Sequence, residues 1–209
     1  MRDDANSARQ SPLFMRDTSW SRVGLPLAAG LLVLAPLVRR RVGRATLLVY
    51  LQLPVYMLHQ YEEHGHGAFK REMNALLPPT VGRLTDRNIF LTNVVGVWGS
   101  DVAATALAAT IAPSAGLVAP YLAVVNAVLH LASALRSRRY NPGLATALLL
   151  FLPFGAYSIR AIGTEVRAAR RAHGLSLATA LALHLLVVLS VVRARETGGK
   201  VIAVEGRVS

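Results

Sequence analysis

The sequence predicts an all-α protein, a polytopic bundle of about six transmembrane helices. Apolar residues make up 53% of the 209-residue chain. Charged residues make up only 16%, well below the roughly 25% of an average soluble domain. The apolar residues gather in long segments that are rich in Ala and Leu and lack the period-two alternation of strands. Because every backbone group in lipid must pair within its own segment, we expect these segments to be helices.

Six apolar segments follow one another along the chain, at residues 24–38, 45–61, 88–112, 115–135, 144–162 and 175–193. The third, fourth and sixth meet the length of about 20 mostly apolar residues that a membrane span needs. The first is short and contains Pro26 and Pro36, so whether it crosses stays open, and the fifth contains Pro153. The second reaches full length only with the polar residues at its end. A soluble bundle is disfavoured, because the third and fourth segments together contain one charge, Asp101, and offer no polar outer face.

The chain is expected to have three parts: a polar mobile tail at residues 1–22, a transmembrane helical domain at 23–195 and a polar C-terminal tail at 196–209. The net charge is +12, from 23 Lys and Arg against 11 Asp and Glu. Since arginines flank the apolar segments, we attribute this excess to membrane orientation and expect no nucleic-acid partner. With six crossings, the side that holds both termini carries most of the basic residues. This predicts the inner (plasma) membrane with both termini cytoplasmic. The arginines at 39–41 and 44 oppose this orientation, because it places them on the non-cytoplasmic side.

The second segment ends in the strongest polar group of the chain. His59, Glu62 and Glu63 stand at positions i, i+3 and i+4, which helical geometry places on one face. A histidine and carboxylates one turn apart can hold one metal ion, and di-iron bundle proteins use a related Glu-x-x-His spacing. The alternative is a solvated helix end, at which the charges simply cap the apolar run.

Other apolar segments also contain polar side chains, which are costly at membrane depth and therefore functional candidates. The fourth segment contains Asn126 and His130 at i and i+4, and the third contains Asn93 and Asp101. On the predicted topology, His130 and Asn93 lie at the same depth as the group on the second segment. Asp101 and His184, in the middle of the sixth segment, lie nearer the midplane, where they extend a polar path or form a separate pair.

The fourth loop contains Tyr140, Asn141, Pro142 and Gly143. Asn-Pro-Gly favours a tight turn, because Pro restricts φ and Gly accepts positive φ. This turn is expected on the same side as the polar group, where Tyr140 could cover it or donate a hydrogen bond. The alternative is an ordinary connection between helices. Three further histidines are expected to be solvated: His64, His66 and His173.

At these residues the chain resembles the HXXEE family of bacterial integral membrane proteins. The family's name describes the run from His59 to Glu63, and two further motifs follow in order. Asn-x-x-x-His matches Asn126 to His130, and Tyr-x-x-Gly matches Tyr140 to Gly143. The resemblance covers roughly residues 45–190. It implies a polytopic membrane protein whose motif residues matter together, and it implies no particular reaction.

The leading hypothesis is a membrane enzyme that acts on a lipid-like or apolar small molecule. In a metal-dependent hydrolase or oxidoreductase, His59 and His130 would be neutral imidazole ligands. Glu62 or Glu63 would be the third ligand, and the other glutamate the general base. Nitrogen and carboxylate ligands in a chain without cysteine suit a divalent zinc, iron or manganese ion. Without metal, a buried glutamate could serve an acid/base isomerase, and Tyr140 is a further catalytic candidate.

Two other functions stay open. A proton-coupled transporter or small-solute channel would depend on Asp101 and His184. In a structural or assembly protein, the polar cluster would only fix helix packing through interhelical hydrogen bonds. In the enzyme hypothesis, three asparagines are expected to support the ligands through hydrogen bonds: Asn126, Asn93 and Asn141. The expected partners are the lipid bilayer and a lipid-like substrate, and the sequence carries no signal for an oligomeric state.

Overall fold

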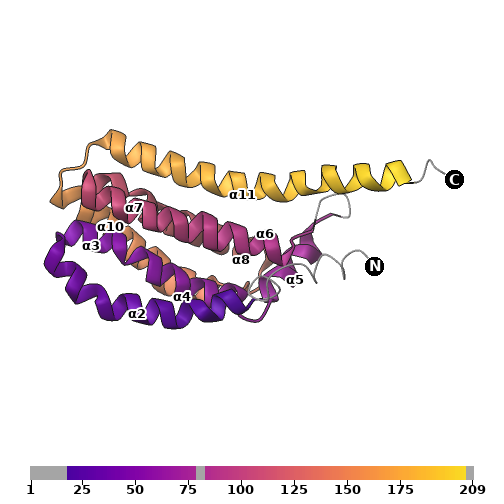
Figure 1. Ribbon diagram of the computed structural model, residues 1–209, viewed down its shortest axis with the longest axis horizontal. Helices are drawn as coiled ribbons and strands as arrows, with labels where there is room; N and C mark the ends of the chain where they lie inside the picture. Colours follow the sequence, from indigo (N-terminus) through magenta and orange to yellow (C-terminus); the bar gives the residue numbers. More distant parts are fainter. Residues whose placement is uncertain (1–17, 79–82, 206–209) are drawn as a thin grey trace.

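The computed structural model describes residues 18–78 and 83–205. Within these residues the chain is helical apart from short connections and contains no strand, which confirms the predicted all-α bundle (Figure 1). The longer helices run back and forth along one axis. The helical elements are α2 (Ser19–Arg41), α3 (Arg44–Tyr50), α4 (Gln52–His64), α5 (Ala68–Leu76), α6 (Asp86–Phe90), η2 (Leu91–Trp98), α7 (Gly99–Thr110), η3 (Pro113–Gly116), α8 (Val118–Ser137), α9 (Leu144–Thr146), η4 (Ala147–Phe151), α10 (Leu152–Glu165) and α11 (Arg170–Glu205).

Four helical stretches of the described residues are long and apolar enough to cross a membrane, which indicates a membrane protein. They are Ser19–Arg41, Asp86–Thr110, Pro113–Ser137 and Leu144–Glu165. The prediction of about six spans was therefore approximate. The second predicted segment is divided at Leu51 into α3 and α4, and the sixth lies in α11.

The first segment is longer than the sequence suggested. α2 begins at Ser19 and continues to Arg41 with Pro26 and Pro36 inside it. A proline removes one backbone donor, and a helix that packs against neighbours tolerates this loss. Trp20, within the predicted N-terminal tail, is buried. Residues 1–17 and 206–209 of the two predicted tails lie outside the described residues, and the backbone of α11 continues past residue 195 to Glu205.

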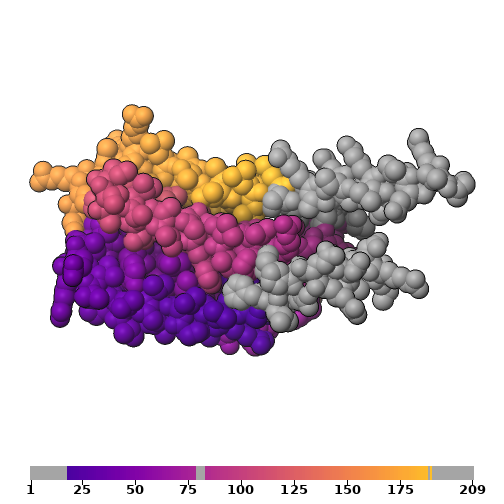
Figure 2. All heavy atoms as spheres, viewed as in Figure 1, coloured from indigo at the N-terminus to yellow at the C-terminus, as the bar shows by residue number. Residues whose placement is uncertain are grey.

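The bundle is held together by small and branched apolar residues between its helices. α8 packs against α4, α10 and α11, and α4 packs mainly against α2. Leu48, Leu117 and Ile162 are buried together in one cluster, and Tyr56 and Phe151 belong to a second. Alanines at these contacts let the helices approach closely. Large apolar side chains on the outer surface are exposed, as expected for a surface that faces lipid. α2 and α11 lie along opposite edges of the face shown in Figure 2.

One end of the bundle gathers most of the polar residues that the sequence singled out. α4 and α8 both end there, and α9 begins there after the turn that contains Asn141 and Gly143 (Figure 1). α9 contacts both α4 and α8. Gly143 has φ +94°, a left-handed conformation that favours glycine. The turn therefore returns the chain to the ends of the two helices that contain His59 and His130.

Candidate functional site

His59, Glu63 and His130 form a compact cluster where α4 meets α8. One potential ligand atom from each residue lies within 4.8 Å of the others. Nε2 of His59 lies 3.5 Å from Oε2 of Glu63, and Nε2 of His130 lies 3.5 Å from Oε1 of the same carboxylate. The three residues are 0%, 6% and 9% exposed, respectively. Two imidazoles from separate helices thus face one buried carboxylate.

Asn141 determines which nitrogen of His130 carries the proton. Its Nδ2 donates to the backbone carbonyl of His130 at 2.9 Å. The amide oxygen therefore faces Nδ1 of the ring, at 2.7 Å. Because that oxygen only accepts, Nδ1 of His130 must donate. In the neutral ring, Nε2 then presents its lone pair to Glu63.

Thr146 has the same effect on His59. Its Oγ1 lies 2.8 Å from Nδ1 of His59 and donates its single proton elsewhere. The nearest acceptor for the proton of this hydroxyl is the Glu62 carboxylate, and the next nearest is the backbone carbonyl of Gly143, at 3.3 Å. Both groups only accept, so the hydroxyl accepts from His59 and Nδ1 of His59 donates. Nε2 of His59 is buried and has no hydrogen-bond partner among the described residues.

The cluster therefore brings together lone pairs that need a positive charge between them. Neutral His59 and His130 each present an unprotonated Nε2, and Glu63 presents carboxylate oxygens. Such atoms repel one another in a buried site unless a proton or a metal ion lies between them. Histidines that bind metals commonly donate their other ring N–H to an oxygen, as both do here. The donor set thus fits a cation bound by two nitrogens and one carboxylate.

Glu62 lies outside this cluster and anchors the turn. One of its oxygens accepts from the hydroxyl of Tyr140 and from the backbone N–H of Ala145 at 3.2 Å. The other accepts from the hydroxyl of Thr146 and from its backbone N–H at 2.7 Å. Partial burial, the hydrogen bond to Glu62 and the charge of that carboxylate raise the pKa of Tyr140. Tyr140 therefore remains a protonated donor at neutral pH, although its side chain is 61% exposed.

Gly143 leaves room for the two imidazoles. A Cβ at this position would lie 2.8 Å from Cε1 of His59 and 2.8 Å from Cε1 of His130. The turn therefore approaches both rings more closely than any other residue would allow. The Tyr-x-x-Gly spacing pointed to this glycine, but only as a turn residue. No pattern in the sequence pointed to Thr146, because it lies inside an apolar segment.

Two of the expected supporting asparagines make hydrogen bonds elsewhere. Asn126 donates to the hydroxyl of Tyr56 at 3.2 Å, one turn before His59 on α4. Asn93 accepts from Gln60 at 2.9 Å, on a different side of α4. Of the three asparagines, Asn141 is the one that hydrogen-bonds a member of the cluster.

Asp101 and His184 do not pair with each other. Asp101 is buried, and neither of its carboxylate oxygens has a hydrogen-bond partner among the described residues. The Nδ1 atom of His184 lies 2.8 Å from the carbonyl of Ala180 on its own helix. His66 is exposed as expected. His173 is half-buried instead, because its ring lies 3.0 Å from the hydroxyl of Tyr121.

His64 was expected to be solvated, and this prediction is wrong. The residue is 2% exposed. Its ring packs against Trp20 on α2, with centroids 5.2 Å apart, and against Phe69 on α5, with centroids 5.0 Å apart. Its Nε2 lies 3.2 Å from Oε2 of Glu63. The start of α2 and the start of α5 cover the end of α4, which periodicity along α4 alone does not reveal.

A family model described as "Protein of unknown function with HXXEE motif" matches residues 50–158. The chain belongs to the HXXEE family. No curated protein and no solved structure matches it. The matched region contains the whole cluster and the turn that covers it. Within the motif, the histidine and the second glutamate face His130, whereas the first glutamate holds residues 140–146 in place.

Proposed function

We propose that this HXXEE protein is a metal-dependent membrane enzyme that acts on a lipid-like or apolar small molecule. The observation that carries the proposal is the convergence of two oriented imidazoles and one carboxylate. Asn141 and Thr146 direct the Nε2 atoms of His130 and His59 to Glu63. A purely structural cluster would be stable with direct hydrogen bonds, whereas Nε2 of His59 has none among the described side chains.

The donor set indicates the class of metal. Two nitrogens and a carboxylate without thiolate suit zinc, iron or manganese. Three protein ligands leave coordination positions free for water or substrate, as in catalytic zinc sites. A metal bound there would activate water or oxygen for hydrolysis or oxidation. The proposed ligands are His59, Glu63 and His130, because one potential ligand atom of each lies within 4.8 Å of the others.

The neighbouring residues act by positioning. Glu62 fixes residues 140–146 through four hydrogen bonds. The hydroxyl of Thr146 in turn positions His59, because it accepts a hydrogen bond from Nδ1 of that ring. We assign Tyr140 the same positioning role, because its hydroxyl donates to Glu62. Phe151 packs against His59 with ring centroids 4.2 Å apart and gives the cluster an apolar wall. Such a wall supports an apolar substrate.

The location of the cluster supports a substrate that arrives from the bilayer. The cluster lies at the ends of α4 and α8, and α8 belongs to a stretch able to cross a membrane. We place the protein in the inner membrane with both termini cytoplasmic, since that side then carries most of the basic residues. On this orientation the cluster faces the cytoplasmic leaflet.

Metal analysis of the purified protein tests the centre. We expect close to one zinc, iron or manganese ion per chain, and loss of that ion in His59→Ala, His130→Ala and Glu63→Gln. Two matched controls should keep it: His184→Ala, since that ring bonds its own helix, and Glu72→Gln, since Glu72 belongs to α5. Wild-type protein that binds none of the three ions, even after loading, would refute the centre.

Comparison of cellular lipids tests the activity. Membranes from cells that produce the wild-type protein should differ in at least one lipid or apolar metabolite from membranes that contain His130→Ala. Cells that produce His184→Ala serve as the control and should resemble the wild type. If the three extracts are identical while the wild-type protein holds its metal, the centre is structural and the enzymatic proposal is wrong.

Asp101 supports a second candidate, proton-coupled transport. A buried carboxyl group without a hydrogen-bond partner is costly in a membrane and marks ion or proton pathways in transporters. If the chain is a transporter, Asp101→Asn in proteoliposomes should abolish proton uptake that is driven by solute. Uptake that equals that of empty liposomes would remove this candidate.

A further inference from the structure

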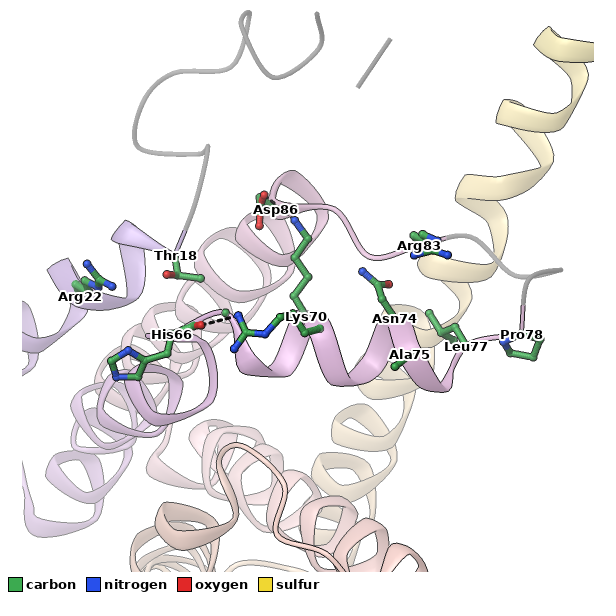
Figure 3. Close-up of a pocket in the computed structure, with 12 residues that line it drawn as sticks. Thr18, Arg22, His66, Lys70, Asn74, Ala75, Leu77, Pro78, Arg83 and Asp86 are labelled. Atoms are coloured by element: carbon green, nitrogen blue, oxygen red, sulfur yellow. Dashed lines mark hydrogen bonds and ion pairs between the residues drawn. The ribbon is translucent and has the colours of Figure 1, made fainter. Parts of the chain in front are cut away.

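A second site lies at the same end of the bundle as the cluster, where two of the membrane-crossing stretches begin. It is a pocket of about 1050 Å³ bordered by the start of α2, α5 and the segment that leads into α6. Four basic side chains line it: Arg22, Lys70, Arg71 and Arg83. Figure 3 shows Arg22 and Arg83 on opposite sides of the pocket, with Lys70 extending between them. His59, Glu63 and His130 do not line it, so it is separate from the proposed metal centre.

Within the described part of the chain, the positive charge of this basic pocket is mostly uncompensated. Asp86 is the one acidic side chain among these lining residues, and it is paired with Lys70 at 2.7 Å. Arg22 donates to the carbonyl of Gly65 at 3.2 and 3.3 Å, and Arg71 donates to the carbonyl of His66 at 2.9 Å. These carbonyl contacts orient the guanidinium groups without neutralising them. Among the described residues, no carboxylate pairs with a guanidinium group of the pocket.

α5 separates the pocket from the apolar core. Its residues Phe69 and Met73 pack around Trp20 and Ile89, at the starts of two membrane-crossing stretches. Lys70 and Arg71, on the same helix, line the pocket instead. An amphipathic helix of this kind, beside the starts of two membrane-crossing stretches, lies at the level of lipid headgroups. The basic pocket therefore faces the region of the bilayer that is rich in phosphate.

We propose that the basic pocket binds the phosphate group of an anionic membrane lipid. Guanidinium groups bind phosphate oxygens in a bidentate manner and suit such headgroups better than they suit zwitterionic ones. A soluble phosphate would meet the same chemistry. The lipid is favoured because the pocket opens beside the starts of α2 and α6, at the level of the headgroups.

Native mass spectrometry of the full-length protein in detergent tests this. The probes are palmitoyl-oleoyl phosphatidylglycerol, the phosphatidylcholine with the same acyl chains, and inorganic phosphate. We expect the phosphatidylglycerol to bind more tightly than the phosphatidylcholine. Arg71→Gln and Arg83→Gln should each weaken its binding about fivefold, and the double variant about 25-fold. The control is Arg87→Gln, an exposed arginine of α6 that does not line the pocket, and it should bind like the wild type.

The following results would contradict the proposal. Equal binding of the two lipids, or a double variant that binds as tightly as Arg87→Gln, overturns the site. Binding of inorganic phosphate without binding of phosphatidylglycerol overturns the lipid and assigns the pocket to a soluble anion. The metal content of the double variant should equal that of the wild type, so this test is independent of the proposed enzyme.

Discussion

Replacement of Thr146 with valine removes the hydroxyl that joins the turn to the proposed metal centre. The substitution keeps the shape of the side chain and leaves the backbone N–H of residue 146 bonded to Glu62 at 2.7 Å. It removes the bond from the hydroxyl to the Glu62 carboxylate and the acceptor of Nδ1 of His59, which lies at 2.8 Å. The perturbation is therefore confined to these two hydrogen bonds and the longer contact of the same hydroxyl with the carbonyl of Gly143, at 3.3 Å.

These two bonds determine the expected magnitude. A hydrogen bond to a charged group contributes about 1.5–3 kcal/mol and a neutral one about 0.5–1.5 kcal/mol. Thr146→Val should therefore lower the free energy of unfolding by about 2–4.5 kcal/mol. Without its acceptor, His59 no longer favours the tautomer with a free Nε2, and loss of such a supporting contact lowers metal affinity about 10–100-fold.

The assay is a competition titration with zinc and a chelator of known affinity, together with thermal unfolding in the same detergent. Thr179→Val is the matched control, because Thr179 is exposed and its hydroxyl bonds to the carbonyl of Leu175 on its own helix, at 2.8 Å. Thr179→Val should match the wild type in both measurements. A Thr146→Val protein with wild-type zinc affinity would refute the argument that Thr146 sets the tautomer of His59.

Two further substitutions probe the turn. Gly143→Ala forces a side chain into a left-handed conformation, which costs about 1–2 kcal/mol, and places a Cβ 2.8 Å from both imidazoles. It should lower both the unfolding midpoint and zinc affinity. Gly30→Ala, inside α2 with open space around the added Cβ, should leave zinc affinity unchanged and should not lower the midpoint, because alanine favours a helix more than glycine does. Equal behaviour of the two variants would contradict the close approach. Tyr140→Phe removes a hydroxyl whose pKa lies above its ordinary value of 10.0 in the folded protein, because of partial burial and Glu62. The stability that this hydroxyl contributes should be complete below about pH 10 and should decrease as the pH rises through the raised pKa. Urea unfolding of wild type and Tyr140→Phe at several pH values measures it, and a difference in stability that is independent of pH up to pH 11 would contradict it.

Local periodicity was sufficient to predict part of the site. His59 and Glu63 stand one helical turn apart, so any α-helix through residue 64 places them on one face. The same periodicity placed Glu62 beside them and did not decide which glutamate joins His130. Glu62 instead accepts hydrogen bonds from residues 140, 145 and 146, which are far away in the sequence. Rotation of α4 against α8 and the turn makes this choice.

The predicted shared depth of the polar residues was less informative. Asn93 does lie beside α4, but its partner is Gln60 and not a member of the cluster. Depth along a membrane follows from position in an apolar segment, whereas the direction of a side chain also depends on the local twist. Asn93 lies in η2, a π-helix, whose wider turn changes the direction of its side chains relative to an α-helix.

The amino-acid order alone was enough to establish the helical, membrane-spanning class of this protein and the pairs of polar residues that share a helix face. Both depend on composition and on contacts within a few residues along the chain, which hold in any environment that excludes water from the backbone. Packing between helices decided the rest: His130 opposite Glu63, Glu62 on the turn, His64 beneath Trp20 and Thr146 against His59. These contacts join residues far apart in the chain, and the relative rotation and approach of whole helices determine them.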